Sequence, residues 1–302
     1  MTALLDRLYR IDAEFGGDEL CGLAAGYLQE AARVFSRTGG SAGTARMHQV
    51  MAGLTQIAGW LSIDANRHAD ARRYLSAAIY AAHEAGDLGL AAHAMGYLSL
   101  SALYQGNHRE AFPLAETAVG LSGPASPAAR AIVHTRAARA PAREGHSALG
   151  ACQRHLDLAW AAFTDSASGG APEPRWCGYV DRVELAAQRG ACFLDLGMPA
   201  QAATAVSEAI GLLTGSAPHR VRDLAHYKTR LALAHLAAGD LDAVMAAGTE
   251  AGTIVSRITS SRIRERFAEL TAAVGTRDPR RARELATVAR GTRLTSGPGP
   301  LS

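Results

Sequence analysis

The chain has 302 residues, a formal net charge of +3, and a composition that is 48% hydrophobic but only 6% aromatic. This length suits two ordinary domains or one continuous repeat array. Frequent alanine favours closely packed helices, and the lack of alternating β-branched and aromatic runs argues against a β-sandwich. No stretch approaches the roughly 18 apolar residues of a membrane-spanning helix, so no membrane partner is predicted.

Every predicted element is a helix. Residues 1–16 form a short entry segment, and two prolines and two glycines within residues 166–174 predict a loop. Pro141 should kink or end its helix early. Residues 1–290 are predicted to form one domain, and residues 291–302 a disordered tail. The predicted helices span residues 18–36, 43–64, 68–85, 89–104, 108–121, 126–143, 147–163, 177–195, 199–213, 219–237, 241–257, 261–273 and 279–290.

A short polar break between two helices recurs five times, at Asn66, Gly106, Gly145, Gly197 and Gly239. The separations of 40, 39, 52 and 42 residues are typical of stacked helix pairs, each burying its apolar face on the next. Glycine at such a break fits a helix end that needs a left-handed residue. The period therefore predicts an all-α solenoid.

Small residues recur at three fixed distances from these breaks. They lie seven residues before, five after and twelve after, as with Gly59, Ala71 and Ala78 around the first break. The third repeat places Asp157 at the last position, so it is either shifted by two residues or degenerate. This register resembles a divergent tetratricopeptide repeat. The resemblance implies a right-handed superhelix with a concave groove.

Three segments resemble a narrower group of proteins. The tetratricopeptide-like C-terminal region of actinobacterial Xre-type helix-turn-helix regulators is similar to LYRIDAEFGG at residues 8–17, LTQIAGWLSIDANRH at 54–68, and WCGYVDRVELA at 176–186 with RGACFLDLG at 189–197. In that family a DNA-binding domain comes first, and here Met1 directly precedes the repeats. We therefore expect the sensor half alone, without direct binding to nucleic acid.

The resemblance implies that the groove receives a peptide, a small molecule or a protein. A cofactor-independent enzyme of secondary metabolism on the same scaffold is the alternative function, and a structural dimeric adaptor is a third. No catalytic residue is assigned, and no dinucleotide or Walker motif calls for a cofactor. Four cysteines without a CxxC motif, and no signal peptide, predict a cytoplasmic protein.

If the resemblance holds, the first helix of each pair lines the groove, where aromatic and polar side chains would mix as in ligand sites. For Trp60 the alternative is a place in the core between repeats, and for the charged residues a solvated surface. The predicted ligand-binding residues are Gln56, Trp60, Asp64, His93, Tyr97, Arg136, Arg139, Trp176, Tyr179, Asp181, Glu184, His226 and Arg230.

Two clusters of charge have competing interpretations. Asp181 and Glu184 could divide acid and base roles, or form ion pairs with Arg136 and Arg139. Ten arginines against four acids in residues 257–293 give a local charge of +6, which suits either contact with an acidic partner or phosphates, or a solvated face that caps the array. The eleven histidines show no metal-binding spacing, so no metal site is predicted.

Overall fold

The structure is a computed structural model, and it describes residues 2–37, 44–166 and 173–291. Within these residues it has no strand, which confirms the all-α prediction. Two short 3-10 turns, η1 (His146–Ala148) and η2 (Arg175–Cys177), accompany the helices. The α-helices are α1 (Thr2–Phe15), α2 (Leu20–Arg37), α3 (Thr44–Asp64), α4 (His68–Glu84), α5 (Leu88–Tyr104), α6 (His108–Leu121), α7 (Pro127–Ala142), α8 (Leu149–Ser166), α9 (Arg182–Asp195), α10 (Pro199–Ser216), α11 (Val221–Ala238), α12 (Leu241–Val255), α13 (Ser261–Gly275) and α14 (Pro279–Ala289).

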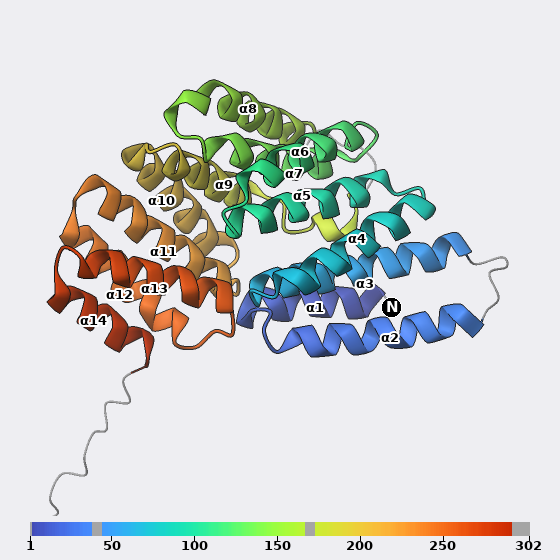
Figure 1. The fold of residues 1–302 in the computed structure, drawn as a ribbon, viewed down its shortest axis with the longest axis horizontal. Coiled ribbons are helices and arrows are strands. Elements are labelled where there is room, and N and C mark those ends of the chain that lie inside the picture. The colour runs from blue at the N-terminus through green and yellow to red at the C-terminus, as the bar shows by residue number, and fades with distance from the viewer. Residues whose placement is uncertain (1, 38–43, 167–172, 292–302) are drawn as a thin grey trace, which may run out of the picture.

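The helices form two layers along an arc (Figure 1). From α3 to α14 each odd-numbered helix packs against the even-numbered helix that follows it. The odd-numbered helices α3 to α13 also contact one another in order, so they form a continuous inner layer. In the described residues no helix is long and apolar enough to cross a membrane.

Backbone conformation at the five breaks follows the sequence pattern. Gly106, Gly145, Gly197 and Gly239 have φ between 73° and 86°, and Asn66 has φ 56°. A left-handed residue lets the chain leave a helix while its amide still bonds a carbonyl of the last turn. Three helices begin with proline in the first turn, at Pro127, Pro199 and Pro279, where the missing amide hydrogen costs no helical hydrogen bond.

The small residues of the register bring paired helices close together. A Cβ atom added to Gly59 would lie 2.5 Å from Cγ of Leu75, and one added to Gly190 would lie 2.5 Å from Cγ2 of Val206. In the third repeat Cys152 is fully buried, whereas Asp157 is exposed. The shift by two residues is therefore the correct interpretation of that repeat.

Three predictions about the elements are wrong. Residues 1–16 are not an entry segment, because α1 occupies Thr2–Phe15. Pro141 does not end α7 early, since it sits in the last turn and the helix continues to Ala142. The helix predicted from residue 177 begins only at Arg182, because the carboxylate of Asp181 accepts a hydrogen bond from the amide of Glu184 and caps the helix.

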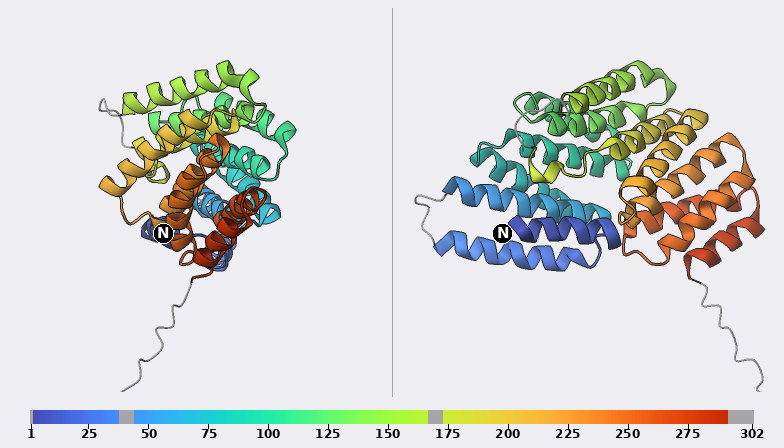
Figure 2. Two further views of the ribbon diagram at one scale, coloured as in Figure 1. Left: turned by 90° about the vertical axis from the view of Figure 1, so that its left-hand side faces the viewer. Right: turned by 180° about the vertical axis from the view of Figure 1, so that it is seen from behind.

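The arc returns to its own beginning, so the array closes into a ring. Helix α1 packs against α11, and α3 contacts α13. The amide of Thr259 donates to the carbonyl of Phe15 over 2.6 Å, and the amide of Asp18 donates to the carbonyl of Thr259 over 3.0 Å. In Figures 1 and 2 the orange α13 accordingly lies against the blue N-terminal helices in every view.

Two further contacts stabilise the junction where the two ends of the ring meet, which we call the joint. The carboxylate of Asp18 accepts from the amide and hydroxyl of Ser261. Deeper in, Asp64 accepts from the guanidinium of Arg262 over 2.7 Å, and both side chains are buried. Burial raises the pKa of Asp64, but Arg262 and Arg222 outweigh it and hold that pKa below its usual range. The predicted tail at 291–302, apart from Gly291, and most of the predicted loop at 166–174 lie outside the described residues.

Candidate functional site

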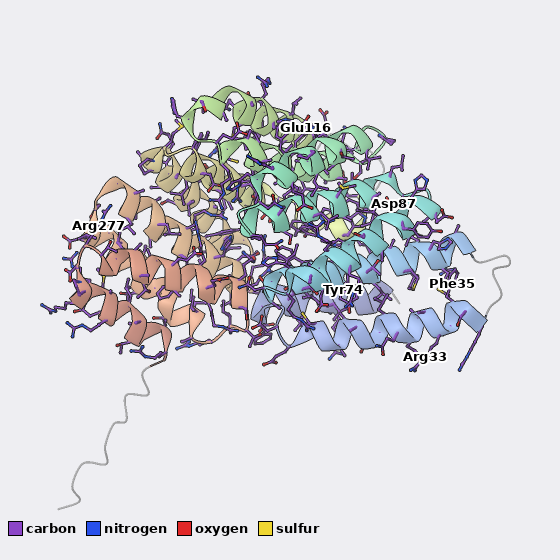
Figure 3. The ribbon with its side chains drawn as sticks, in the orientation of Figure 1. Arg33, Phe35, Tyr74, Asp87, Glu116 and Arg277 are labelled. Atoms are coloured by element: carbon purple, nitrogen blue, oxygen red, sulfur yellow. The ribbon has the colours of Figure 1, made fainter. Side chains whose placement is uncertain are left out.

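The ring encloses a cavity of about 450 Å³, which we call the aromatic cavity. Five of the chain's eight tyrosines and two of its three tryptophans line it. For a chain with 6% aromatic residues this is a strong concentration in one place. Side chains labelled in Figure 3, such as Glu116 and Arg277, lie instead at the outer edge of the array. The aromatic lining residues are Tyr9, Trp60, Tyr97, Tyr104, Trp176, Tyr179 and Tyr227.

Ring stacking fixes the aromatic wall. Trp60 of α3 stacks on Tyr97 of α5 with ring centroids 5.1 Å apart. Trp176 of η2 stacks on His93 of α5 at 4.6 Å, so this turn, yellow in Figure 1, folds back onto the inner layer. The segment after the long gap between Gly145 and Gly197 therefore builds part of the wall.

A line of hydrogen bonds runs behind the aromatic rings. The hydroxyl of Tyr97 donates to that of Tyr179 over 3.4 Å, and Tyr179 lies 2.7 Å from Nε2 of His93. Burial, with help from Arg136, lowers the pKa of His93 to about 3, so this imidazole is neutral. Burial also raises the pKa of Tyr97 to about 12. None of these three groups exchanges a proton near neutral pH.

A buried ion pair forms the polar side of the aromatic cavity. The guanidinium of Arg136 donates to Oε1 of Glu184 over 3.2 Å, and Gln188 donates to the same oxygen over 2.9 Å. Tyr227 donates to the other carboxylate oxygen over 3.3 Å. Burial lowers the pKa of Arg136, but Glu184 and nearby tyrosines outweigh it, so that pKa lies above its usual range. Arg136 therefore keeps its positive charge at neutral pH.

Asp12 of α1 is the exception among these ionisable groups. Its Oδ2 accepts from Nε1 of Trp60 over 2.8 Å and lies 3.4 Å from Arg222. Its Oδ1 is buried without a partner in the described residues. Burial raises the pKa of Asp12 to about 6, against the opposing effect of Arg222.

Several buried polar atoms around the aromatic cavity lack a hydrogen-bond partner within the described residues. Buried polar groups in folded proteins nearly always have partners, so these atoms are available to bind water or a ligand. Among the residues that line the cavity, these atoms are Oδ1 of Asp12, Nε and Nη1 of Arg136, Nε1 of Trp176, Nε of Arg222 and Nδ1 of His226.

A second cavity of about 290 Å³, which we call the basic cavity, lies next to the first. The two share Tyr104, His226 and Arg262 in their linings. On α5, α7 and α9 the basic cavity is lined by residues nearer the C-terminal end of the helix than those that line the aromatic cavity. The arginines that line the basic cavity are Arg139, Arg143, Arg230, Arg262 and Arg266.

The predicted site residues divide among three places. Those on the wall of the aromatic cavity are Trp60, Tyr97, Arg136, Trp176, Tyr179, Asp181, Glu184 and His226. Those on the wall of the basic cavity are Arg139, His226 and Arg230. Gln56, Asp64 and His93 line neither cavity; Gln56 accepts from the hydroxyl of Tyr9, Asp64 binds Arg262, and His93 supports Trp176.

The side chains of Asp181 and Glu184 form ion pairs, but not all with the predicted partners. Arg136 pairs with Glu184, but Arg139 pairs with Asp195 over 3.0 Å, and Asp181 pairs with Arg220 over 2.8 Å. Asp181 and Glu184 thus belong to an ion-pair network. Among the described residues no group of three or more potential ligands could hold a metal ion.

Sequence reasoning missed the residues that ring closure brings in. Tyr9 and Asp12 come from α1, and Arg262 comes from α13. Arg222 and Tyr227 were also missed, although they share α11 with the predicted His226 and Arg230. The amphipathic pattern of residues 1–16 was the available signal, because a helix there needs a partner surface.

The sequence was compared with models of protein families and with curated proteins. Neither comparison finds a match. The two cavities are therefore the features of the molecule that point to a function.

Proposed function

We propose that this protein is a ligand-binding module of the sensor type, and that its ligand is a planar aromatic acid held in the aromatic cavity. One observation carries the proposal: an aromatic-poor chain gathers seven tyrosine and tryptophan side chains around a cavity of about 450 Å³. That volume suits a small molecule and is too small for a folded partner.

The chemistry of the wall supports this class of ligand. Offset stacking on Trp60 or Tyr97 would hold a flat ring system. Unpaired donors on Arg136 and Arg222 would bind a carboxylate, because charge-assisted hydrogen bonds are the strong ones in a buried site. The neutral His93 and Tyr179 are fixed by their mutual hydrogen bond, so they support the wall and do not supply a base.

The repeat family and the cellular location of the protein are also part of the proposal. We propose that the helix pairs are tetratricopeptide-like repeats in a right-handed superhelix, related to the sensor region of Xre-type regulators, and that the protein acts in the cytoplasm. The support is the register of small residues and the four free cysteines, all buried. A peptide in the same cavity is the other occupant that this family resemblance suggests.

An enzyme is the second candidate function, and one residue favours it. Asp12 lines the aromatic cavity with one unpaired oxygen, and burial raises its pKa to about 6. A carboxyl group with such a pKa can donate a proton near neutral pH. Conversion of a bound acid by the native protein, abolished in Asp12→Asn, would support this alternative over a sensor.

Tryptophan fluorescence tests the proposal directly. Trp160 is 47% exposed on α8, away from the aromatic cavity, so Trp160→Phe leaves Trp60 and Trp176 as the only emitters. We expect naphthoate to change this emission saturably and naphthamide to bind at least about tenfold more weakly, because the amide lacks the charge. Trp60→Phe in the same background should reduce the signal.

Three outcomes would contradict the proposal. Naphthoate without a saturable signal would exclude a planar acid in the aromatic cavity. Equal affinity for naphthoate and naphthamide would exclude a role for the arginines. An unchanged response in Tyr179→Phe and in Tyr97→Ala would place the ligand elsewhere, and Tyr80→Phe is the matched control because Tyr80 is 67% exposed.

A further inference from the structure

The basic cavity contains an arginine that no carboxylate balances. Arg230 of α11 is only 7% exposed. Its guanidinium donates to the carbonyl of Ala187 over 2.9 Å and to Nε2 of His226 over 2.8 Å. Among the described residues no carboxylate oxygen lies within 4.0 Å of it. A buried cation without a counter-ion is strongly disfavoured, so this position needs a compensating anion.

The neighbouring charges do not supply one. Asp195 is shared by Arg139 at 3.0 Å and Arg143 at 3.5 Å, and Arg262 is matched by Asp64 outside this cavity. Three arginines therefore face one carboxylate at the buried end, which leaves a local charge of +2. Burial and the proximity of Arg139 lower the pKa of Arg230 to about 10, which still leaves it charged at neutral pH.

Helix ends offset only part of this excess. Arg139 and Arg143 lie at the C-terminal end of α7, where the helix carries about half a negative charge. Arg230 lies in the middle of α11 and gains nothing from a helix end. The acids Glu265 and Glu269 also line the basic cavity, but both are exposed, and Glu269 already pairs with Arg266.

The imidazole of His226 presents a free donor beside Arg230. Arginine only donates, so Nε2 of His226 must accept, and the ring proton lies on Nδ1. That Nδ1 atom is buried and has no partner among the described residues, and the same holds for Nε of Arg143. The cavity wall thus offers unsatisfied N–H donors as well as excess positive charge.

We propose that the basic cavity is a binding site for a small oxyanion of charge −2, a phosphate or a polycarboxylate, held by Arg143, Arg230 and His226. Both sources present several oxygens at the spacing that guanidinium and imidazole N–H groups recognise. A volume of about 290 Å³ limits the ligand to a small molecule. The site adjoins the aromatic cavity and shares His226 with it, but Arg143 and Arg230 line only the basic cavity, and the inference does not depend on the function proposed for the aromatic cavity.

Isothermal titration of the whole protein with inorganic phosphate, and in a second arm with succinate, tests this site. We expect saturable binding of at least one of them that persists when sodium chloride replaces the buffer salt at equal ionic strength. Arg230→Gln should weaken that binding by about tenfold or more, because it removes a charged donor. Arg189→Gln is the matched control, since Arg189 pairs on the outside with Glu208.

Thermal stability distinguishes an arginine that binds a ligand from one that only stabilises the fold. In phosphate-free buffer we expect Arg230→Gln to unfold at the same or a higher temperature than the native protein, because the substitution removes an uncompensated buried charge. The proposal fails if neither anion binds the native protein, or if Arg230→Gln binds as tightly as the control. It also fails if Arg143→Gln and Arg230→Gln both lower the midpoint of unfolding in phosphate-free buffer.

Discussion

Arg136 of α7 and Glu184 of α9 form an ion pair in the wall of the aromatic cavity, with 3.2 Å between Nη2 and Oε1 and each side chain less than 10% exposed. The guanidinium carbon also lies 5.8 Å from the ring centroid of Tyr97. The pair thus joins two inner helices, and it orients a cation against the aromatic surface. Its position makes it both a structural bond and a binding group.

Removal of one partner should therefore destabilise the fold. Glu184→Gln leaves Arg136 buried without a counter-charge, and we expect the free energy of unfolding to fall by about 3 kcal/mol. Urea denaturation measures this change. Glu208→Gln is the control, because the exposed pair of Arg189 and Glu208 should contribute less than about 1 kcal/mol. Similar losses in both variants would contradict the argument.

Close approach of paired helices gives a second prediction. Gly190→Ala places a Cβ atom 2.5 Å from Val206 and 3.3 Å from the carbonyl oxygen of Ala202, so we expect a loss of about 1–3 kcal/mol. Gly211→Ala, at an exposed position of α10 with nothing within 4 Å, should instead gain about 0.5–1 kcal/mol. Thermal unfolding of both variants distinguishes steric crowding from helix propensity.

These glycines also show why the fold was largely predictable. The register at Gly59 and Gly190 and the breaks such as Gly106 are local features of the chain, and local sequence determines them. Eight of the thirteen predicted ligand-binding residues line the aromatic cavity, and the register itself pointed to three of them, Trp60, Glu184 and His226. Asp181 was predicted to lie inside a helix that begins at residue 177, whereas its side chain caps a helix that begins at Arg182.

Closure of the ring could not be predicted in this way. Asp64 and Arg262 are separated by 198 residues, and no periodic pattern links them. The curvature that brings them together is a sum of small rotations over several helix pairs. Ring closure alone brings Tyr9, Asp12 and Arg262 to the aromatic cavity, so no sequence pattern predicted them there.

A substitution at Asp18 should weaken the joint between the two ends of the ring. Asp18→Asn keeps the side-chain volume but removes the charge that binds Ser261 and Arg264. We expect hydrogen exchange at the amides of Asp18 and Thr259 to accelerate about tenfold, since a charge-assisted bond is worth about 1.5–3 kcal/mol. Asp240→Asn, which alters a helix cap remote from the joint, should leave both amides unchanged. Equal protection in both variants would mean that Asp18 does not hold the joint.

The pH dependence of stability should identify Asp12. Its folded pKa of about 6 lies above the ordinary 3.8, so its protonated form favours the native state. The associated stability is fully present below about pH 4 and is lost as the pH rises through 6. Relative to Asp12→Asn, the native protein should therefore lose up to about 3 kcal/mol between about pH 4 and pH 8. A constant difference between the two proteins would contradict the assignment.

Contact of α1 with α11 and of α3 with α13 has a consequence for how the molecule folds. An open array can begin folding at any repeat and spread to its neighbours. Here the bonds of Phe15 with Thr259, and of Asp64 with Arg262, join segments about two hundred residues apart, and such distant contacts form late. The cavities would thus be completed only at the final step of folding, and partly folded chains would lack them.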